Sequence, residues 1–374
     1  MSDDILEPDR TPGAPHPRDT ARLIGQSAAE AGFLDAYRAG RLHHAWMITG
    51  PRGVGKATLA WRIARFLLAN PDDDGGMFAP PPPVTLDIDP ASPVVRRIAA
   101  QSESRLTLLR RPYDDKTARL RTEITVDEVR KMKSFFTLSA ADGGRRVAII
   151  DAVDELNTSA ANALLKLLEE PPPRVTLLLI SHQPARLLPT IRSRCRELRA
   201  LPLASADLAA ALSQAGGDVT PDDRIRLAEL AGGSVGEAFR LTNLDGLKLY
   251  GVLIALFATL PRLDRPRAQA LADAGSGKGT EAQFDLIVTL IDLFLARLAR
   301  AGTLGESPLE AARGEAALLA RLSPDPEAGR TWADLAQSLT IRARRGKAVN
   351  LDPSALLMDM ILKIDEVAGI LAQR

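Results

Sequence analysis

The chain has 374 residues, 45% of them hydrophobic, and a formal net charge of +1 at pH 7. This length favours two or three domains with sizeable cores, and the near-zero charge gives no general attraction to nucleic acid. We find no apolar run of the roughly 18 residues that a membrane helix needs. The single cysteine, Cys195, excludes an intrachain disulfide and a multi-cysteine zinc site. We therefore expect a cytoplasmic protein with no metal site and no membrane contact.

The first part of the chain predicts an α/β fold. Residues 1–22 are rich in Pro and Asp and predict a flexible lead-in. Short, continuous apolar runs follow at 45–49, 147–150 and 175–180. Runs of this length suit parallel strands that are covered on both faces, and helical stretches separate them. We therefore expect a doubly wound parallel sheet over residues 23–200.

The remaining segments differ in composition. Residues 70–93 are rich in Asp, Gly and Pro and predict an exposed insertion in the sheet domain. After Pro202 the strand signals fade, and Ala/Leu-rich helical periodicity takes over. This pattern predicts a small helical lid domain over 201–245 and an all-α domain over 246–374.

A glycine-rich loop follows the first predicted strand and opens a helix. Its sequence is Gly50-Pro51-Arg52-Gly53-Val54-Gly55-Lys56, the pattern of a P-loop. In such a loop the backbone N–H groups surround phosphate oxygens, and the lysine neutralises their charge. The candidate nucleotide-binding residues are therefore Gly50, Gly53, Gly55, Lys56, Thr58 and Asp151, the last at the end of a strand of Walker B type.

Two groups that ATP hydrolysis needs are missing from this site. The position after the P-loop lysine normally carries a hydroxyl that binds magnesium, and here it is Ala57. The position after Asp151 normally carries the glutamate that polarises water, and here it is Ala152. Asp154 and Glu155 lie too far along the chain to replace it, so we expect them to be cap or turn residues.

Four stretches of the sequence resemble the AAA+ subunits of bacterial clamp loaders. They are Leu23-Ile24-Gly25-Gln26, the P-loop, the run 156–172 and Ser193-Arg194-Cys195. The resemblance covers residues 23–200 and implies a AAA+ domain followed by a lid and an oligomerising collar. Many relatives also carry a four-cysteine zinc module after the P-loop helix, where this chain has the 70–93 insertion.

The resemblance also implies a function. Clamp loaders are hetero-oligomeric rings that place the beta sliding clamp of DNA polymerase III on primed DNA during replication. Their motor subunits hydrolyse ATP, whereas a stator subunit has a degraded site. Ala57, Ala152 and Gly236, the last at the place of a sensor arginine, put this chain on the stator side. We expect no intrinsic ATPase and no required cofactor, with weak ATP or ADP binding still possible.

Arg194 is the catalytic candidate. In the family, the arginine of this triplet extends into the ATP site of the neighbouring subunit as an arginine finger, so Arg194 would act in trans. The implied partners are the gamma/tau and delta subunits, with the beta clamp and primed DNA reached through the complex. A structural alternative for Arg194 is a salt bridge at the edge of the sheet.

Several alternatives remain open at this point. The chain could be an ATP-hydrolysing motor subunit of the gamma/tau kind, or a P-loop binding module that acts outside replication. Residues 96–146 hold thirteen Arg and Lys against seven Asp and Glu. This excess could face DNA phosphates, or it could be a solvated surface or a subunit contact.

Overall fold

The computed structural model describes residues 7–20, 22–70, 83–114, 116–117, 119–138, 144–216, 219–277, 279–305 and 308–373. The chain divides into two compact units. The first is Met1–Asp218 with Gly232–Phe239, and the second is Val219–Ala231 with Arg240–Arg374.

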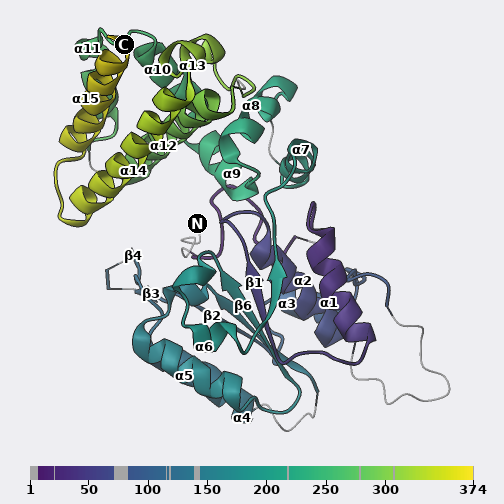
Figure 1. Ribbon diagram of the computed structural model, residues 1–374. Helices are drawn as coiled ribbons and strands as arrows, with labels where there is room; N and C mark the ends of the chain where they lie inside the picture. Colours follow the sequence, from purple (N-terminus) through teal and green to yellow (C-terminus); the bar gives the residue numbers. More distant parts are fainter. Residues whose placement is uncertain are drawn as a thin grey trace. The chain divides into compact units, whose positions relative to one another are not determined.

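The first unit is built on a five-stranded sheet with the strand order β2-β5-β6-β1-β7 (Figure 1). The strands are β1 (Ala45–Thr49), β2 (Leu106–Arg110), β5 (Arg146–Asp151), β6 (Val175–Ser181) and β7 (Arg196–Arg199). Every neighbouring pair in this sheet is parallel. The carboxyl ends of the strands therefore share one edge, which is where α/β proteins bind ligands.

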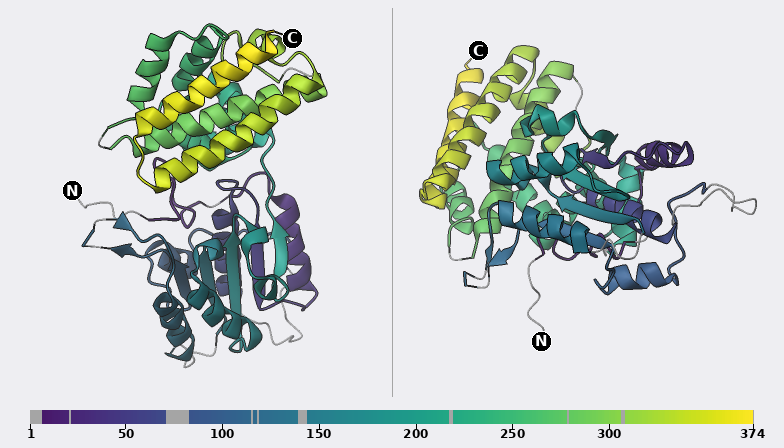
Figure 2. Two further views of the ribbon diagram at one scale, coloured as in Figure 1. Left: turned by 60° about the vertical axis from the view of Figure 1, so that its left-hand side comes forward. Right: turned by 90° about the horizontal axis from the view of Figure 1, so that it is seen from below.

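Helices cover both faces of this sheet, as Figures 1 and 2 show. One face packs on α1 (Ser27–Arg38), α2 (Lys56–Ala69) and α3 (Pro93–Ala99), and the other on α4 (Val126–Leu138) and α5 (Thr158–Glu169). In β1, Trp46 and Ile48 enter the first core, whereas Ala45 and Met47 enter the second. Successive strand residues alternate between the faces, so an apolar run fills both cores.

Smaller elements complete the first unit. They are a hairpin of β3 (Tyr113–Asp114) and β4 (Arg119–Leu120), the helices α6 (Pro189–Arg192) and α7 (Ser205–Gln214), the short turns η2 (Val153–Glu155) and η3 (Pro184–Arg186), and the start of α9 (Val235–Asn243).

The second unit is helical. It contains the end of α9 with α8 (Pro221–Ala231), α10 (Gly246–Phe257), α11 (Arg265–Ala274), α12 (Glu281–Leu304), α13 (Glu315–Leu322), α14 (Pro326–Ala348) and α15 (Pro353–Leu371). The long helices α12 and α14 lie side by side (Figure 2). In its core the fully buried Glu315 accepts hydrogen bonds from Tyr250 Oη and Arg297 Nε, both at 2.6 Å.

The predicted α/β sheet and the helical C-terminal region are confirmed, and the three predicted strands correspond to β1, β5 and β6. The predicted domain boundaries at 201–245 and 246–374 stay a prediction. By contacts α7 groups with the sheet, whereas α8 groups with the second unit.

The lead-in and the insertion lie partly outside the described residues, which lack 1–6, 21 and 71–82. Within residues 7–20, His16 is only 3% exposed, whereas Arg10, Pro12, Gly13, Pro15 and Asp19 are exposed. At the end of the insertion Leu86 is buried in the core beside α2, and Asp87 pairs with Arg62 at 2.9 Å. The described parts of the lead-in and of the insertion therefore make more contacts with the sheet domain than we expected from the sequence.

Candidate functional site

The P-loop connects β1 to α2 at the carboxyl edge of the sheet. Gly50, Gly53 and Gly55 all have positive φ angles. At Gly53 glycine is required by space as well, because a Cβ atom would lie 2.3 Å from Ser234 Oγ and 2.8 Å from Gly236 N. The predicted loop is thus formed, and a second segment of the first unit lies directly on it.

This second segment, residues 233–236, is bonded to the P-loop backbone. Ser234 Oγ donates to Arg52 O at 2.9 Å, and Gly236 N donates to Gly53 O at 3.2 Å. A Cβ atom at Gly236 would lie 3.0 Å from Gly53 Cα. A longer side chain at position 236 would therefore meet the P-loop itself, and the assignment of this position to a sensor arginine stays a prediction.

Lys56 turns back onto its own loop. Its Nζ donates to Gly50 O at 2.7 Å and also to Pro51 O. Burial lowers the pKa of Lys56 to about 8, although Asp151 and Asp154 oppose this change. The lysine is therefore held in the P-loop by carbonyl groups, in the place where a phosphate would otherwise bind it.

The Walker B strand ends as the sequence predicts. Burial raises the pKa of Asp151 to about 7, and the nearby charges of Asp9 and Glu155 add to the effect. Ala152 is buried and brings only a methyl group to the position of the polarising glutamate. Ala57 and Thr58 both line the same cavity as Lys56, so Ala57 leaves a magnesium ion without its usual hydroxyl ligand.

Asp154 and Glu155 are occupied by other contacts. Asp154 accepts hydrogen bonds from Ser181 Oγ at 2.8 Å and from the backbone N–H of His182. Glu155 pairs with Arg111 at 2.8 Å and with Arg52 at 3.4 Å. Both carboxylates therefore hold neighbouring segments together, which supports a structural role.

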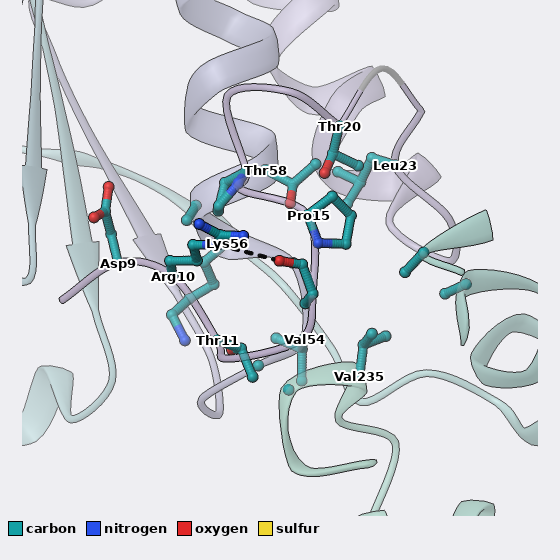
Figure 3. A pocket seen from close by; sticks show the side chains of 18 of the residues that line it. Asp9, Arg10, Thr11, Pro15, Thr20, Leu23, Val54, Lys56, Thr58 and Val235 are labelled. Atoms are coloured by element: carbon teal, nitrogen blue, oxygen red, sulfur yellow. Dashed lines mark hydrogen bonds between the residues drawn. The ribbon is translucent and has the colours of Figure 1, made fainter. Parts of the chain in front are cut away.

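The P-loop and the end of β5 border a cavity of about 550 Å³ within the first unit. Lys56, Thr58, Asp151 and His182 line it, and so does the N-terminal segment from Pro8 to Arg22 (Figure 3). Burial lowers the pKa of His182 to about 3, with Lys56 and Arg52 adding to the effect, so the imidazole is neutral. The sequence reasoning missed the N-terminal part of this site.

Arg194 lies away from this cavity, just before the edge strand β7. Its Nη2 pairs with Glu169 Oε1 at 2.9 Å, and its Nη1 donates to Thr190 O at 2.9 Å. The salt bridge considered as the structural alternative is thus present. The side chain is still 36% exposed, so the guanidinium is open to solvent.

The basic stretch 96–146 is largely paired within the chain. Ion pairs or carbonyl contacts engage Arg97, Arg105, Arg110, Arg111, Arg121, Arg130, Lys131 and Arg146. Such pairing reduces the charge available to phosphates and favours the alternative of a surface or subunit contact.

The described residues contain no group of three or more His, Cys, Asp or Glu side chains that could hold a metal ion. Among the same residues no helix is long and apolar enough to cross a membrane.

The sequence of the first unit is similar to subunits of DNA polymerase III. The family described as "DNA polymerase III, delta subunit" matches residues 25–204. DNA polymerase III subunit delta' of Pseudomonas aeruginosa is 37% identical over 199 residues, which are 53% of this chain and 55% of that protein. DNA polymerase III subunit tau of Escherichia coli is 30% identical over 287 residues, 75% of this chain and 41% of that one.

The chain thus spans about half the length of the curated relatives it matches. Among solved structures, a gamma subunit-related protein of Thermotoga maritima covers 90% of this chain and 99% of its own, with a TM-score of 0.36 and 17% identity. The assignment of the fold comes from the sheet order and the P-loop. Residues 25–204 therefore form a P-loop AAA+ domain, and this part of the chain, just under half of it, matches the DNA polymerase III delta-subunit family by sequence.

Proposed function

We propose that this chain is the delta-prime, or stator, subunit of the DNA polymerase III clamp loader. In this role it helps to load the beta sliding clamp onto primed DNA and does not hydrolyse ATP itself. The observation that carries the proposal is the pair of methyl groups at Ala57 and Ala152, in a domain whose P-loop glycines and lysine are all present. Without the magnesium hydroxyl and the polarising carboxylate, the attacking water and the γ-phosphate lack their catalytic partners.

Arg194 would be the chemical contribution of this subunit. An arginine finger stabilises the charge that develops on the γ-phosphate, and it acts on a site in a neighbouring subunit. The solvent-open guanidinium of Arg194 can exchange an exposed carboxylate for a phosphate at little cost, because exposed ion pairs are weak. Its partner in the ring would be a gamma/tau subunit, with delta as a further neighbour.

No cofactor would be required for this role. Lys56 is already satisfied by loop carbonyls, and the site offers no replacement for the magnesium hydroxyl. Binding of ATP or ADP would therefore be weak and would have no chemical consequence in this chain.

The test is ATP turnover, first of the purified chain and then of the complex with the gamma/tau and delta subunits, the beta clamp and primed DNA. We expect no turnover by the chain alone. In the complex, Arg194→Ala should lower the stimulated turnover, whereas Arg192→Ala, an exposed arginine two residues away, should not. Equal turnover with Arg194→Ala and wild type would contradict the finger.

A second candidate is an ATP-hydrolysing motor subunit of the gamma/tau kind. The similarity to subunit tau, which extends over 75% of this chain, favours it. This candidate requires turnover by the isolated chain and its loss in Lys56→Ala, so the same first measurement separates the two.

A further inference from the structure

Residues 7–20, which we call the N-terminal strap, cross the cavity beside the P-loop as a series of tight turns. Arg10 N donates to Glu7 O at 3.2 Å, Ala14 N to Thr11 O at 3.1 Å, and Asp19 N to His16 O at 2.9 Å. Prolines occupy positions 8, 12, 15 and 17. Because proline fixes φ, this strap loses little conformational entropy when it is ordered.

The far end of the strap is tied to the helix that follows the P-loop. Arg65 of α2 is buried and donates to Arg18 O at 2.6 Å and to Thr20 O at 2.7 Å. Arg18 in turn pairs with Glu7 at 2.9 Å. Displacement of the strap would leave a buried guanidinium without these acceptors, which is costly.

The near end of the strap carries a buried carboxylate. The side chain of Asp9 is fully enclosed and pairs with Arg110. His16 Nδ1 accepts a hydrogen bond from Arg18 N at 3.0 Å, so the ring hydrogen is on Nε2, which lies 3.2 Å from Asp9 Oδ2. His16 also packs edge-on against Trp61, with ring centroids 5.9 Å apart. The position of Asp9 is thus fixed from two sides.

This position adjoins the nucleotide site. Arg110 is the register partner of Asp151 in the neighbouring strand, so a carboxylate bound to Arg110 lies beside Asp151. Thr11 and Pro15 of the strap line the cavity together with Lys56 (Figure 3). The strap therefore brings the Asp9 carboxylate and side-chain bulk to the place where nucleotide phosphates would enter, and its Arg10 lines the same cavity.

We propose that the N-terminal strap is a built-in occupant of the nucleotide pocket, and that its Asp9 carboxylate keeps nucleotide phosphates away from the P-loop. The strap then narrows the pocket, and a nucleotide that binds to the P-loop has to displace it. The proposal concerns the pocket of this chain alone and holds whether or not Arg194 acts on a partner subunit.

The test uses the purified full chain and a fluorescent ADP, N-methylanthraniloyl-ADP, in EDTA, so that the missing magnesium ligand plays no part. Asp9→Asn removes the charge and keeps the shape. We expect it to raise the affinity for the probe at least about tenfold, equivalent to about 1.4 kcal/mol. The control Asp35→Asn removes an exposed carboxylate of α1 that pairs with Arg38, and it should leave the affinity unchanged.

Two further measurements test whether an increase in probe affinity depends on the P-loop and on displacement of the strap. Adding Lys56→Ala to Asp9→Asn should return the affinity to that of the wild type. Saturating probe should speed hydrogen exchange at the amides of residues 9–20. A second route is Pro15→Gly with Pro17→Gly, which loosens the strap, keeps every charge and should also raise the affinity.

The proposal is overturned if folded Asp9→Asn and the double glycine variant both bind the probe no more tightly than the wild type. It is also overturned if the gain survives Lys56→Ala, or if the strap amides stay protected when the probe is bound. None of these outcomes bears on the turnover of the clamp-loader complex, so the two proposals fail separately.

Discussion

Glu169, the last residue of α5, holds Arg194 with its Oε1 2.9 Å from Arg194 Nη2. Both side chains are more than a third exposed, so the pair contributes at most about 1 kcal/mol to stability. A second contact, from Nη1 to Thr190 O at 2.9 Å, fixes the plane of the guanidinium. The pair with Glu169 therefore acts mainly by orienting the Arg194 guanidinium and contributes little to the stability of the fold.

Glu169→Ala should for this reason lower the stimulated ATP turnover of the complex less than Arg194→Ala does. Loss of a finger costs about 10³-fold or more at the affected site, and misplacement of a positioned group costs up to about 10²-fold. The melting temperature of the isolated chain should hardly change. Glu170→Ala, at the next exposed glutamate, is the matched control. Full turnover in Glu169→Ala would show that Thr190 O orients the guanidinium without help.

Asp154→Ala tests the structural assignment of that carboxylate. The substitution leaves Ser181 Oγ and the N–H groups of His182 and Gln183 without their acceptor. We expect a loss of roughly 2–4 kcal/mol in the free energy of unfolding, measured by urea denaturation, with no effect on nucleotide hydrolysis. Asp127→Ala removes only an exposed pair with Arg130 and should cost less than about 1 kcal/mol. Equal losses in the two variants would argue against a structural role for Asp154.

Local patterns carried most of what the sequence predicted about the fold. The strands β1, β5 and β6 are buried along their apolar runs and were found from them. Asn157 caps α5, because its side chain accepts a hydrogen bond from Ala160 N at 2.9 Å. The edge strand β7 was missed because three of its four residues are charged and exposed, so no apolar run marks it.

The N-terminal part of the candidate site could not be predicted in the same way. Asp9 and Arg110 are 101 residues apart and meet only because β2 lies next to β5 in the sheet. Composition suggested a free segment, since Pro and Asp are common in linkers. In the folded chain the same prolines stiffen a strap whose anchors, Arg65 and Arg110, come from distant elements.

The buried Lys56 predicts a pH dependence of stability. Its pKa is about 8 in the folded chain, against an ordinary value of 10.5. Between these values the unfolded chain holds one more proton than the folded chain, so the free energy of unfolding rises with pH in this window. Below pH 8 the penalty is complete and constant.

Lys56→Met has no titrating amine at this position, so comparison with the wild type isolates the contribution of Lys56 to the pH dependence of stability. The stability of the wild type relative to Lys56→Met should increase between pH 8 and pH 10.5, by up to about 3 kcal/mol. Urea denaturation of both proteins at several pH values gives the difference, in which the titration of groups that do not interact with Lys56 cancels. A difference that is constant with pH would mean that Lys56 is protonated throughout, held by the carbonyls of Gly50 and Pro51.

The buried hydrogen-bonded group of Tyr250, Arg297 and Glu315 should contribute to the stability of the second unit. Glu315 is the acceptor for both partners, and its other oxygen accepts from Ala311 N at 2.7 Å. Glu315→Ala leaves Arg297 buried with its weaker contact to Glu229 at 3.4 Å and its hydrogen bond to Leu309 O, and removes its closest carboxylate. We expect a loss of about 3–5 kcal/mol, whereas Tyr250→Phe, which removes one hydroxyl, should cost about 1–2 kcal/mol.

The double variant Glu315→Met with Arg297→Met distinguishes a buried charge from lost packing. If the cost of Glu315→Ala comes mainly from a buried guanidinium that has lost its closest carboxylate, removing both charges should recover most of it, since apolar replacements of buried ion pairs are often tolerated. Urea denaturation of the full chain gives the three free energies of unfolding. A double variant as unstable as Glu315→Ala would instead assign the cost to the backbone of residues 311–312, whose N–H groups Glu315 holds.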